Sequence, residues 1–171
     1  MGELLPGYDL QVGSSLERSR LLRWLIRTYQ ELFPHLTDFS HLDQQISHHF
    51  SRETPLWWVV PQGEAGGADS PDLLPSQSTA IAPVAGLWWG WAVDQADGQR
   101  IPHVFWIHVL PDYRRQGIGR SLLKRLEVEA QSAGAVGISL QVYDQNAGAI
   151  AFYESLGYAP QAVVMRKSLG L

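Results

Sequence analysis

The residues best suited to chemistry lie in one short stretch, Arg114-Arg115-Gln116-Gly117-Ile118-Gly119, which is followed by Arg120. An apolar run precedes this glycine loop (residues 114–120), and an amphipathic sequence follows it. A helix start leaves several backbone N–H groups without intrahelical partners, and the helix dipole adds about half a positive charge there. With arginines around it, such a helix start is suited to bind phosphate. The glycine loop is therefore predicted to bind an anion.

The two glycines of the loop have an alternative interpretation. Gly117 and Gly119 lack a Cβ atom, so the backbone can take unusual dihedral angles and a phosphate can approach it closely. However, glycine before a helix is also common at ordinary loop–helix junctions, and a lone G-x-G is a weak signal. The sequence has no G-x-x-x-x-G-K-[ST], and no third glycine completes G-x-G-x-x-G. The phosphate is therefore not expected to belong to a P-loop nucleotide or to a Rossmann dinucleotide.

A second stretch, from Asn146 to Tyr153, can contribute to the same site. Asn146 is suited to cap a helix, and Tyr153 lies seven residues later, about two turns on, hence on nearly the same face. A helix that links two parallel strands brings both strand ends and the helix start to one edge of the sheet. Asn146 and Tyr153 can then face whatever extends from the glycine loop. An N-cap near a half-buried tyrosine is the alternative.

The spacing of apolar residues predicts a mixed α/β fold around these stretches. A capping box, Ser14 with Glu17, opens the first helix, whose apolar face is expected to hold Leu22, Leu25, Ile26, Tyr29 and Leu32. Asp97-Gly98 indicates a hairpin, and the helix after Gly117 should join two parallel strands. The expected strands are 8–12, 56–60, 84–93, 101–110, 138–143 and 158–167 (one strand or a pair), and the expected helices are 14–33, 42–50, 117–133 and 146–156.

Length and composition indicate one soluble domain of 171 residues, expected in the cytoplasm. A net charge of -4 argues against a nucleic-acid partner. There is no cysteine that could form a disulfide or act as a nucleophile. No apolar stretch is long enough to span a membrane, so a membrane is not expected as a partner. Within the single domain we expect first helices and strands in 1–60, a long mobile loop in 62–83, and the sheet core in 84–171.

The histidines and tryptophans are assigned mainly to structure. His41, His48 and His49 lie on or near one predicted helix, but there is no H-E-x-x-H and no cysteine, so no metal site is expected. Indole side chains bury large areas and dominate packing. As a hypothesis, one or two of them line a pocket for an apolar or cationic ligand. The tryptophans on predicted strands are Trp57, Trp58, Trp88, Trp89, Trp91 and Trp106.

The segment from about Pro102 to Lys167 resembles the acetyl-CoA-binding half of the GNAT superfamily of N-acetyltransferases. The resemblance rests on the strand ending in Ile107-His108-Val109, on the glycine loop with its Arg-x-x-Gly-x-Gly pattern, and on Asn146-x-x-Ala149-x-x-x-Tyr153-x-x-x-Gly157-Tyr158. Residues 84–87 match the family's third strand more weakly, and residues 1–80 match only in the order of elements. The implied fold is a mostly antiparallel sheet with one splayed parallel pair, flanked by about four helices.

The resemblance also implies roles for individual residues. The pyrophosphate of acetyl-CoA would be held by the backbone N–H groups that follow Arg114 in the motif. These belong to Arg115, Gln116, Gly117, Ile118, Gly119 and Arg120. Ile107, His108 and Val109 would pair with the pantetheine arm like an added strand, and the Val109 amide would polarise the thioester carbonyl. Asn146 would contact the cofactor arm. Tyr153 would be the general acid that protonates the departing thiolate.

The implied reaction moves an acetyl group directly from acetyl-CoA to a primary amine, on a small molecule or on a protein. An amine with a pKa near 10.4 is almost fully protonated at pH 7, so a base must accept its proton. His103 is the first candidate, since strand alternation places 103, 105, 107 and 109 on one face, with His108 on the other. Some family members carry a glutamate near this position, and an imidazole without a catalytic task is the alternative.

Three further alternatives stay open from the sequence. The chain could be a catalytically idle module that binds or senses acyl-CoA, because the base is not identified. It could transfer an acyl group longer than acetyl, because the sequence does not reveal pocket depth. It could also act as a homodimer, because the sequence does not determine the oligomeric state.

Overall fold

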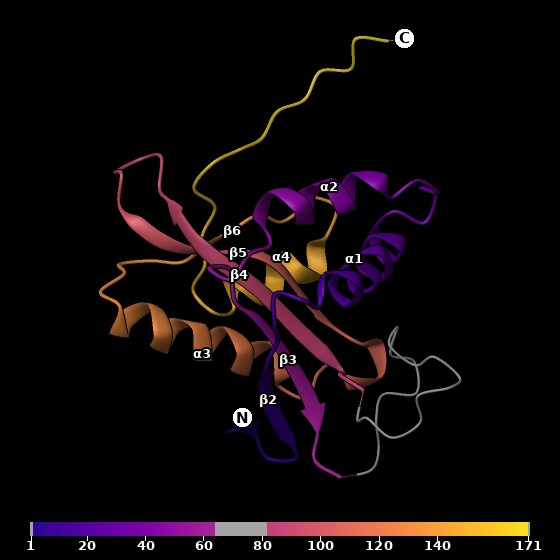
Figure 1. Ribbon diagram of the computed structural model, residues 1–171. Coiled ribbons are helices and arrows are strands. Elements are labelled where there is room, and N and C mark those ends of the chain that lie inside the picture. The colour runs from indigo at the N-terminus through magenta and orange to yellow at the C-terminus, as the bar shows by residue number, and fades with distance from the viewer. Residues whose placement is uncertain (1, 64–81, 171) are drawn as a thin grey trace. The chain divides into compact units, whose positions relative to one another are not determined.

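The computed structural model describes residues 2–63 and 82–170, so most of the loop expected at 62–83 lies outside the described residues (Figure 1). The chain divides into two compact units, residues 1–141 and residues 142–171. The first unit contains the sheet, and the second contains the last helix.

The first unit is built on a six-stranded sheet in the order β1-β2-β3-β4-β5-β6 (Figure 1). All neighbouring strands are antiparallel except β5 and β6, which are parallel, so the predicted mixed sheet with one parallel pair is confirmed. The edge strand β1 was not predicted. The strands are β1 Gly2–Leu5, β2 Tyr8–Val12, β3 Leu56–Pro61, β4 Ala85–Val93, β5 Arg100–Val109 and β6 Ser139–Leu140.

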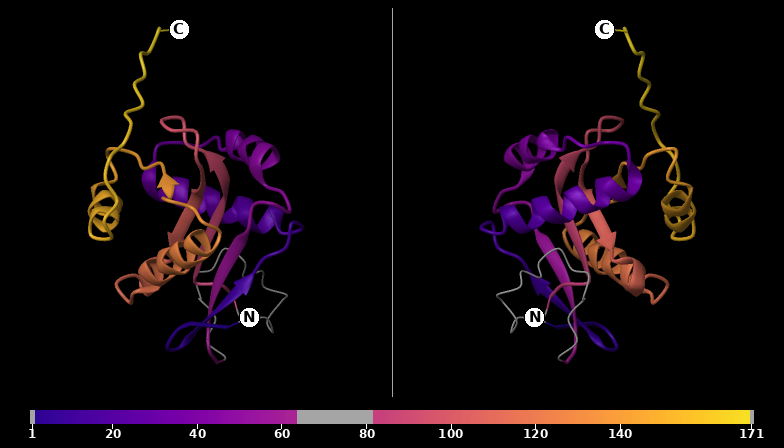
Figure 2. Two further views of the ribbon diagram at one scale, coloured as in Figure 1. Left: turned by 90° about the vertical axis from the view of Figure 1, so that its left-hand side faces the viewer. Right: turned by 90° about the vertical axis from the view of Figure 1, so that its right-hand side faces the viewer.

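Three helices cover this sheet. Helices α1 and α2 lie on one face of the sheet, and α3 lies on the other face (Figure 2). Helix α3 follows β5 and leads to β6, which confirms that a helix links the two parallel strands. Its buried side includes all four predicted residues, Ile118, Leu122, Leu126 and Ala130. The helices are α1 Arg18–Leu32, α2 Ser40–His49 and α3 Ile118–Ser132, with a short 3-10 helix, η1, at Pro111–Tyr113.

Helix α1 begins later than predicted, because only half of the capping box forms. The Glu17 side chain reaches back and accepts a hydrogen bond from the Ser14 N–H at 2.9 Å. The Ser14 hydroxyl accepts from the Leu16 N–H at 3.3 Å, so it does not cap the helix proper, which begins at Arg18. Part of the box is thus used to close the turn that precedes the helix.

The buried face of α1 is also shifted from the predicted one. Leu21, Trp24 and Leu25 are buried, whereas Leu22 and Ile26 are only half-buried, as are the predicted Tyr29 and Leu32. The reason is Trp24, whose ring packs 5.4 Å from the ring of Trp58 and 5.9 Å from that of Trp106. One large indole outweighs several smaller side chains in deciding which face is buried.

Strands β4 and β5 form the predicted hairpin. The Asp94 N–H donates to the Gln99 carbonyl at 2.8 Å, and Gly98 has the positive φ, 74°, that this turn requires. Close packing above the hairpin also depends on a glycine. A Cβ atom on Gly86 would lie 2.7 Å from the Trp106 ring and 2.8 Å from the Trp58 ring. The absence of a side chain there lets two indoles meet over the middle of the sheet.

Strand β5 contains a bulge that changes which side chains share a face. Trp88 pairs with Trp106, but Trp89 pairs with Val104, so Phe105 is an extra residue in β5. Such an insertion places consecutive side chains on one face and increases the local twist. Phe105 packs against Trp88 at 4.7 Å and stacks on His49 of α2 at 5.2 Å, which places it on the face that α1 and α2 cover.

Strand β6 is shorter than predicted and pairs only with the first half of β5. The predicted strand 138–143 reduces to Ser139–Leu140, in register with His103 and Val104. The parallel ladder therefore ends before Phe105. Beyond it, β5 continues to Val109 and has no ladder partner on that side among the described residues, where the family resemblance implies that the two strands part.

The second unit contains helix α4, Ala147–Glu154, and no strand in its described residues. The predicted helix 146–156 is confirmed, with Gly157 just past its end at a φ of 90°. The predicted last strand, 158–167, is wrong: the chain is irregular there, and Val163, Val164 and Met165 are exposed. Within this unit the segment has no neighbouring strand to satisfy its N–H and C=O groups. Among the described helices of the chain, none is long and apolar enough to cross a membrane.

Candidate active site

The glycine loop lies between η1 and α3 and contains two residues in the left-handed region. Arg115 has a φ of 64°, and Gly117, the N-cap of α3, has a φ of 87° and a ψ of -2°. A left-handed residue other than glycine costs about 1–2 kcal/mol, and such strain gathers at ligand clamps. Alternating backbone conformations of this kind turn successive N–H groups toward one concave side, which suits an anion.

The start of α3 adds to this concave side. The cap residue Gly117 makes no side-chain cap hydrogen bond, and the first-turn N–H groups of Ile118, Gly119 and Arg120 have no intrahelical acceptor. Arg115 and Arg120 are exposed at the same helix start. The 15-residue helix directs the positive end of its dipole to this point. The residues present therefore fit a bound diphosphate.

The side chain of Gln116 is held away from the helix start by strand β2. Its Oε1 atom accepts a hydrogen bond from the Tyr8 hydroxyl at 2.6 Å, and its Nε2 atom donates to the Asp112 carbonyl at 3.2 Å. The Tyr8 ring packs edge-on against Tyr113 at 6.4 Å, and burial, with a smaller contribution from Tyr113, raises the pKa of Tyr8. These contacts anchor the loop to the sheet through side chains and leave recognition to its main chain.

Arg114 is likewise directed toward the rest of the first unit. Its Nε atom donates to the Val109 carbonyl at 2.8 Å, and one terminal nitrogen donates to Glu31 Oε2 on α1 at 2.6 Å. From its place in the motif, Arg114 was predicted to add positive charge around the loop. Its charge is instead paired with the Glu31 carboxylate.

The end of β5 presents main-chain groups on the side away from β4. The Leu110 N–H donates to the Val84 carbonyl at 2.9 Å, and Val109 is in register with Ala85. Because the N–H and C=O groups of successive strand residues alternate in direction, those of Ile107 and Val109 point away from β4. This is the edge along which β6 has already ended. An extended molecule could pair with β5 there.

The bulge at Phe105 corrects the predicted placement of the histidines. Phe105 packs on His49 of α2, and the His103 ring lies 5.2 Å from the Phe105 ring. His108 lies 5.9 Å from Trp24 of α1. His103 and His108 therefore both face the α1 and α2 side of the sheet, whereas strict alternation predicted opposite faces. The extra residue between them is the physical reason.

His103 is half-buried and has a polar partner on β6. Its Nδ1 atom lies 2.9 Å from the Ser139 hydroxyl, which is in register with it. Burial lowers the pKa of His103 below 6.5, and the charge of His49 lowers it further. The imidazole is therefore mainly neutral at pH 7, with a nitrogen able to accept a proton. Ser139, which orients this ring, carries no motif that sequence reasoning could have used.

His108 is 7% exposed and lies beside a carboxylate. Its Nε2 atom is 3.5 Å from Glu31 Oε1, and within the described residues it has no hydrogen-bond partner. Burial lowers the pKa of His108 to about 4, although Glu31 opposes this shift. The imidazole is therefore neutral over the whole physiological range.

We expect the free energy of unfolding to fall as the pH is lowered from 6.5 to about 4. In this range the unfolded chain binds a proton at His108, with a pKa near 6.5, and the folded chain does not. The stability is thus present above pH 6.5 and is lost as the pH falls toward 4, by about 3 kcal/mol. Urea unfolding as a function of pH measures this loss. His108→Gln should reduce the slope between pH 6.5 and 4, and an unchanged slope would contradict the assignment.

The two predicted residues of the second unit are placed by α4. Asn146 caps this helix, because its Oδ1 atom accepts a hydrogen bond from the Ala149 N–H at 3.2 Å. Tyr153 is half-buried, with ring contacts to Phe152 at 5.4 Å and to Tyr158 at 5.8 Å. Burial raises the pKa of Tyr153 to about 12. The phenol is therefore protonated at neutral pH and can only donate a proton in a first step.

The histidines of the second helix make local contacts. His48 Nδ1 lies 2.7 Å from the Gln44 carbonyl, His49 stacks on Phe105, and the His41 ring packs against Tyr29 at 5.6 Å. Over residues 2–63 and 82–170, no group of three or more histidine, aspartate or glutamate side chains could hold a metal ion.

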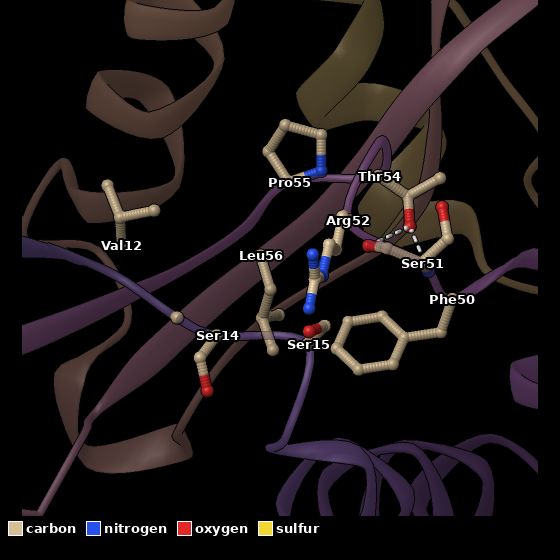
Figure 3. A pocket seen from close by; sticks show the side chains of 10 residues that line it. Val12, Ser14, Ser15, Phe50, Ser51, Arg52, Thr54, Pro55 and Leu56 are labelled. Atoms are coloured by element: carbon tan, nitrogen blue, oxygen red, sulfur yellow. Dashed lines mark hydrogen bonds between the residues drawn. The ribbon is translucent and has the colours of Figure 1, made fainter.

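A small cavity of about 130 Å³ lies elsewhere in the first unit, between the segment that joins β2 to α1 and the segment that joins α2 to β3 (Figure 3). The Arg52 side chain reaches across it toward Ser15 (Figure 3). The hydroxyl of Thr54 is already bonded to the Ser51 main chain. None of the predicted site residues lines this cavity, whose lining residues are Val12, Gly13, Ser14, Ser15, Phe50, Ser51, Arg52, Thr54, Pro55 and Leu56.

A family model described as the acetyltransferase (GNAT) family matches residues 18–158, which is most of the chain. The chain belongs to the GNAT family of acetyltransferases. Members of this family use acetyl-CoA as the acetyl donor. The family resemblance inferred from the glycine loop and from the Asn146–Tyr153 stretch is confirmed.

Individual relatives agree with this assignment. The chain is 51% identical over 55 residues to the [ribosomal protein bS18]-alanine N-acetyltransferase of Escherichia coli, a match of 32% of this chain and 37% of that enzyme. An acetyltransferase of Sodalis glossinidius is 36% identical over 95 residues, which are 56% of this chain and 63% of the relative. The chain thus spans only about a third of the bacterial alanine N-acetyltransferases it matches.

Solved structures share the fold at low sequence identity. The ribosomal-protein-alanine N-acetyltransferase of Brucella melitensis has a TM-score of 0.61 at 17% identity, over 94% of this chain and 99% of that one. The aminoglycoside 6'-N-acetyltransferase AAC(6')-Ih of Acinetobacter baumannii also has a TM-score of 0.61 at 17% identity, over 96% of this chain and 100% of that one. These likenesses support the mixed sheet with one parallel pair.

Proposed function

We propose that this protein is an N-acetyltransferase that moves an acetyl group from acetyl-CoA directly to a primary amine. The observation that carries the proposal is the geometry of the glycine loop in a chain of the GNAT family. Two left-handed residues and an uncapped helix start turn main-chain N–H groups to one side. Backbone recognition of this kind suits the diphosphate of coenzyme A.

In this proposal the donor is held by main-chain groups of the first unit. The amides of Arg115 through Arg120 bind the pyrophosphate, and the outward edge of Ile107–Val109 pairs with the pantetheine arm. The Val109 N–H donates to the thioester oxygen, where negative charge develops in the transition state. The thioester is thereby both oriented and polarised for attack.

The transfer step forms one bond and breaks one bond. The neutral amine nitrogen attacks the carbonyl carbon, the C–N bond forms, and the C–S bond breaks. Tyr153 donates its proton to the leaving thiolate, in line with a pKa of about 12 that keeps the phenol protonated. Asn146, at the start of the same helix, contacts the pantetheine arm.

His103 is proposed as the base that accepts the proton of the amine. We expect His103→Ala to flatten the acidic limb of the profile of kcat/KM against pH, because that limb reports a base in the free enzyme. Burial and His49 lower the pKa of His103, so the limb should lie below pH 6.5. His48→Ala serves as the control, since its ring is bonded to the Gln44 carbonyl on α2. An acidic limb that persists in His103→Ala would place the base elsewhere.

The acceptor is proposed only as a primary amine. Relatives are named for an alanine of ribosomal protein bS18 and for aminoglycosides, so peptides beginning with alanine and aminoglycosides are the first acceptors to test. Thiol release from acetyl-CoA should be measured with these acceptors, with polyamines and with amino acids. Mass spectrometry should show one added acetyl group on the acceptor. Binding of coenzyme A without transfer to any acceptor would favour an idle acyl-CoA-binding module instead.

A further inference from the structure

Glu31, on α1, is the centre of a charged cluster at the end of β5. Its Oε2 atom accepts a hydrogen bond from Arg114 at 2.6 Å, and its Oε1 atom lies 3.8 Å from Arg27 Nε and 3.5 Å from His108 Nε2. His108 is neutral because of its burial, so the carboxylate is balanced by the two arginines. A bidentate or multiply bonded carboxylate fixes a guanidinium more firmly than a single exposed pair does.

We infer that Glu31 is a positioning residue for the transfer reaction, because it holds Arg114 against the Val109 carbonyl and thereby orients the Val109 N–H. The inference rests on the proposed function, in which that N–H polarises the thioester. Glu31 touches neither donor nor acceptor in this account. It acts through Arg114 on the main chain.

The main-chain groups of Val109 both point to the side where Arg114 lies. In a strand, the N–H and C=O groups of one residue point to the same side. The register with Ala85 turns both groups of Val109 away from β4, toward the edge that β6 does not cover. A guanidinium that holds the carbonyl at 2.8 Å therefore restrains the N–H of the same residue. Small errors in the position of a catalytic group cost much of its effect.

Arg114 lies where its guanidinium could bind either the Val109 carbonyl or the phosphates. Its side chain is 46% exposed and follows directly on η1, at the beginning of the glycine loop. Without an acidic partner on α1, its guanidinium would be free to turn to the phosphates bound by the loop, and the Val109 carbonyl would lose its donor. The Glu31 carboxylate at 2.6 Å keeps the guanidinium on the β5 side. The charge of Arg114 is thus used for orientation and not for phosphate binding.

The test separates turnover from cofactor affinity in variants of the full chain. Glu31→Ala should lower kcat roughly tenfold, a fraction of the 10²–10³ lost when an oxyanion donor is removed outright. The Kd of coenzyme A, measured by titration calorimetry, should stay the same or fall, because coenzyme A has no thioester carbonyl for Val109 to polarise and the released Arg114 adds positive charge near the phosphates. Glu31→Gln, which keeps an oxygen for Arg114 and nearly the same volume, should recover most of kcat. If Glu31→Ala does not fold, Arg114→Ala takes its place and should show a similar loss of kcat, because it removes the same restraint on Val109.

A control and a second variant make the result specific. Glu129→Ala removes an exposed carboxylate bonded at 2.7 Å to Arg125 on α3, and it should leave kcat unchanged. In Arg114→Ala, the further change Glu31→Ala should have no additional effect, because the two residues act as one unit. An unchanged kcat in Glu31→Ala, or an equal loss of coenzyme A affinity, would overturn the inference. A wild-type protein that does not bind coenzyme A would overturn the proposed function, and this inference with it.

Discussion

Gly119→Val is expected to abolish measurable binding of coenzyme A, with at least a hundredfold loss of affinity. Gly119 lies in the first turn of α3, where a valine side chain would cover the N–H groups that are proposed to bind the pyrophosphate. Each hydrogen bond to a charged group contributes about 1.5–3 kcal/mol, so the loss of two accounts for the expected effect. Titration calorimetry with coenzyme A measures it directly.

Gly119 is a better test position than Gly117. Gly117 has a φ of 87°, so any side chain there strains the backbone and could unfold the loop, whereas Gly119 is not among the described glycines with a positive φ. Lys124→Val, at an exposed position of the same helix, controls for the introduction of a β-branched side chain into α3. Full affinity in a folded Gly119→Val protein would show that the glycine loop does not bind the diphosphate.

Tyr153→Phe should lower kcat by about 10²–10⁴ while the Kd of coenzyme A stays nearly unchanged. The substitution removes one oxygen and little packing, and a general acid contributes an acceleration of this size. Because the Tyr153 pKa is about 12, the phenol is a proton donor throughout the range in which the enzyme would work. Steady-state kinetics with saturating acetyl-CoA, combined with titration calorimetry, measures both quantities.

Tyr158→Phe is the matched control for this experiment. The Tyr158 ring lies 5.8 Å from that of Tyr153 in the same unit, but the proposed mechanism gives its hydroxyl no task. Its loss should leave kcat within about threefold of wild type, because a single neutral hydrogen bond contributes only about 0.5–1.5 kcal/mol. A Tyr153→Phe protein as active as the wild type would remove Tyr153 from the mechanism.

Local patterns predicted most of the elements that position the site. The hairpin followed from Asp97-Gly98, the buried face of α3 from its i, i+4 spacing, and the start of α4 from Asn146. These features depend on residues within a few positions of one another, so the sequence displays them directly. The predicted strand at 158–167 failed because a strand also needs a neighbour, which local patterns do not specify.

The residues that brace the site could not be predicted in the same way. Tyr8 reaches Gln116 across 108 positions, and Glu31 reaches Arg114 across 83. A lone tyrosine or glutamate on an exposed face carries no signal of such a partner. The bulge at Phe105 likewise has no recognisable sequence pattern, although this one extra residue places His103 on the same face as His108. The register of the strands and the tertiary contacts determine the bulge and these long-range hydrogen bonds, whereas the secondary-structure propensities of single residues do not.

Binding of the diphosphate by the glycine loop can be measured from the change of backbone amide chemical shifts when coenzyme A is added to ¹⁵N-labelled protein. We expect the largest changes at the amides of residues 115–120, with further changes at Ile107 and Val109. Addition of acetyl-CoA in place of coenzyme A should shift the Val109 amide further, because only the thioester offers it an acceptor. Saturable binding whose shifts leave residues 115–120 unaffected, or no binding at all, would show that the glycine loop is not the coenzyme A site.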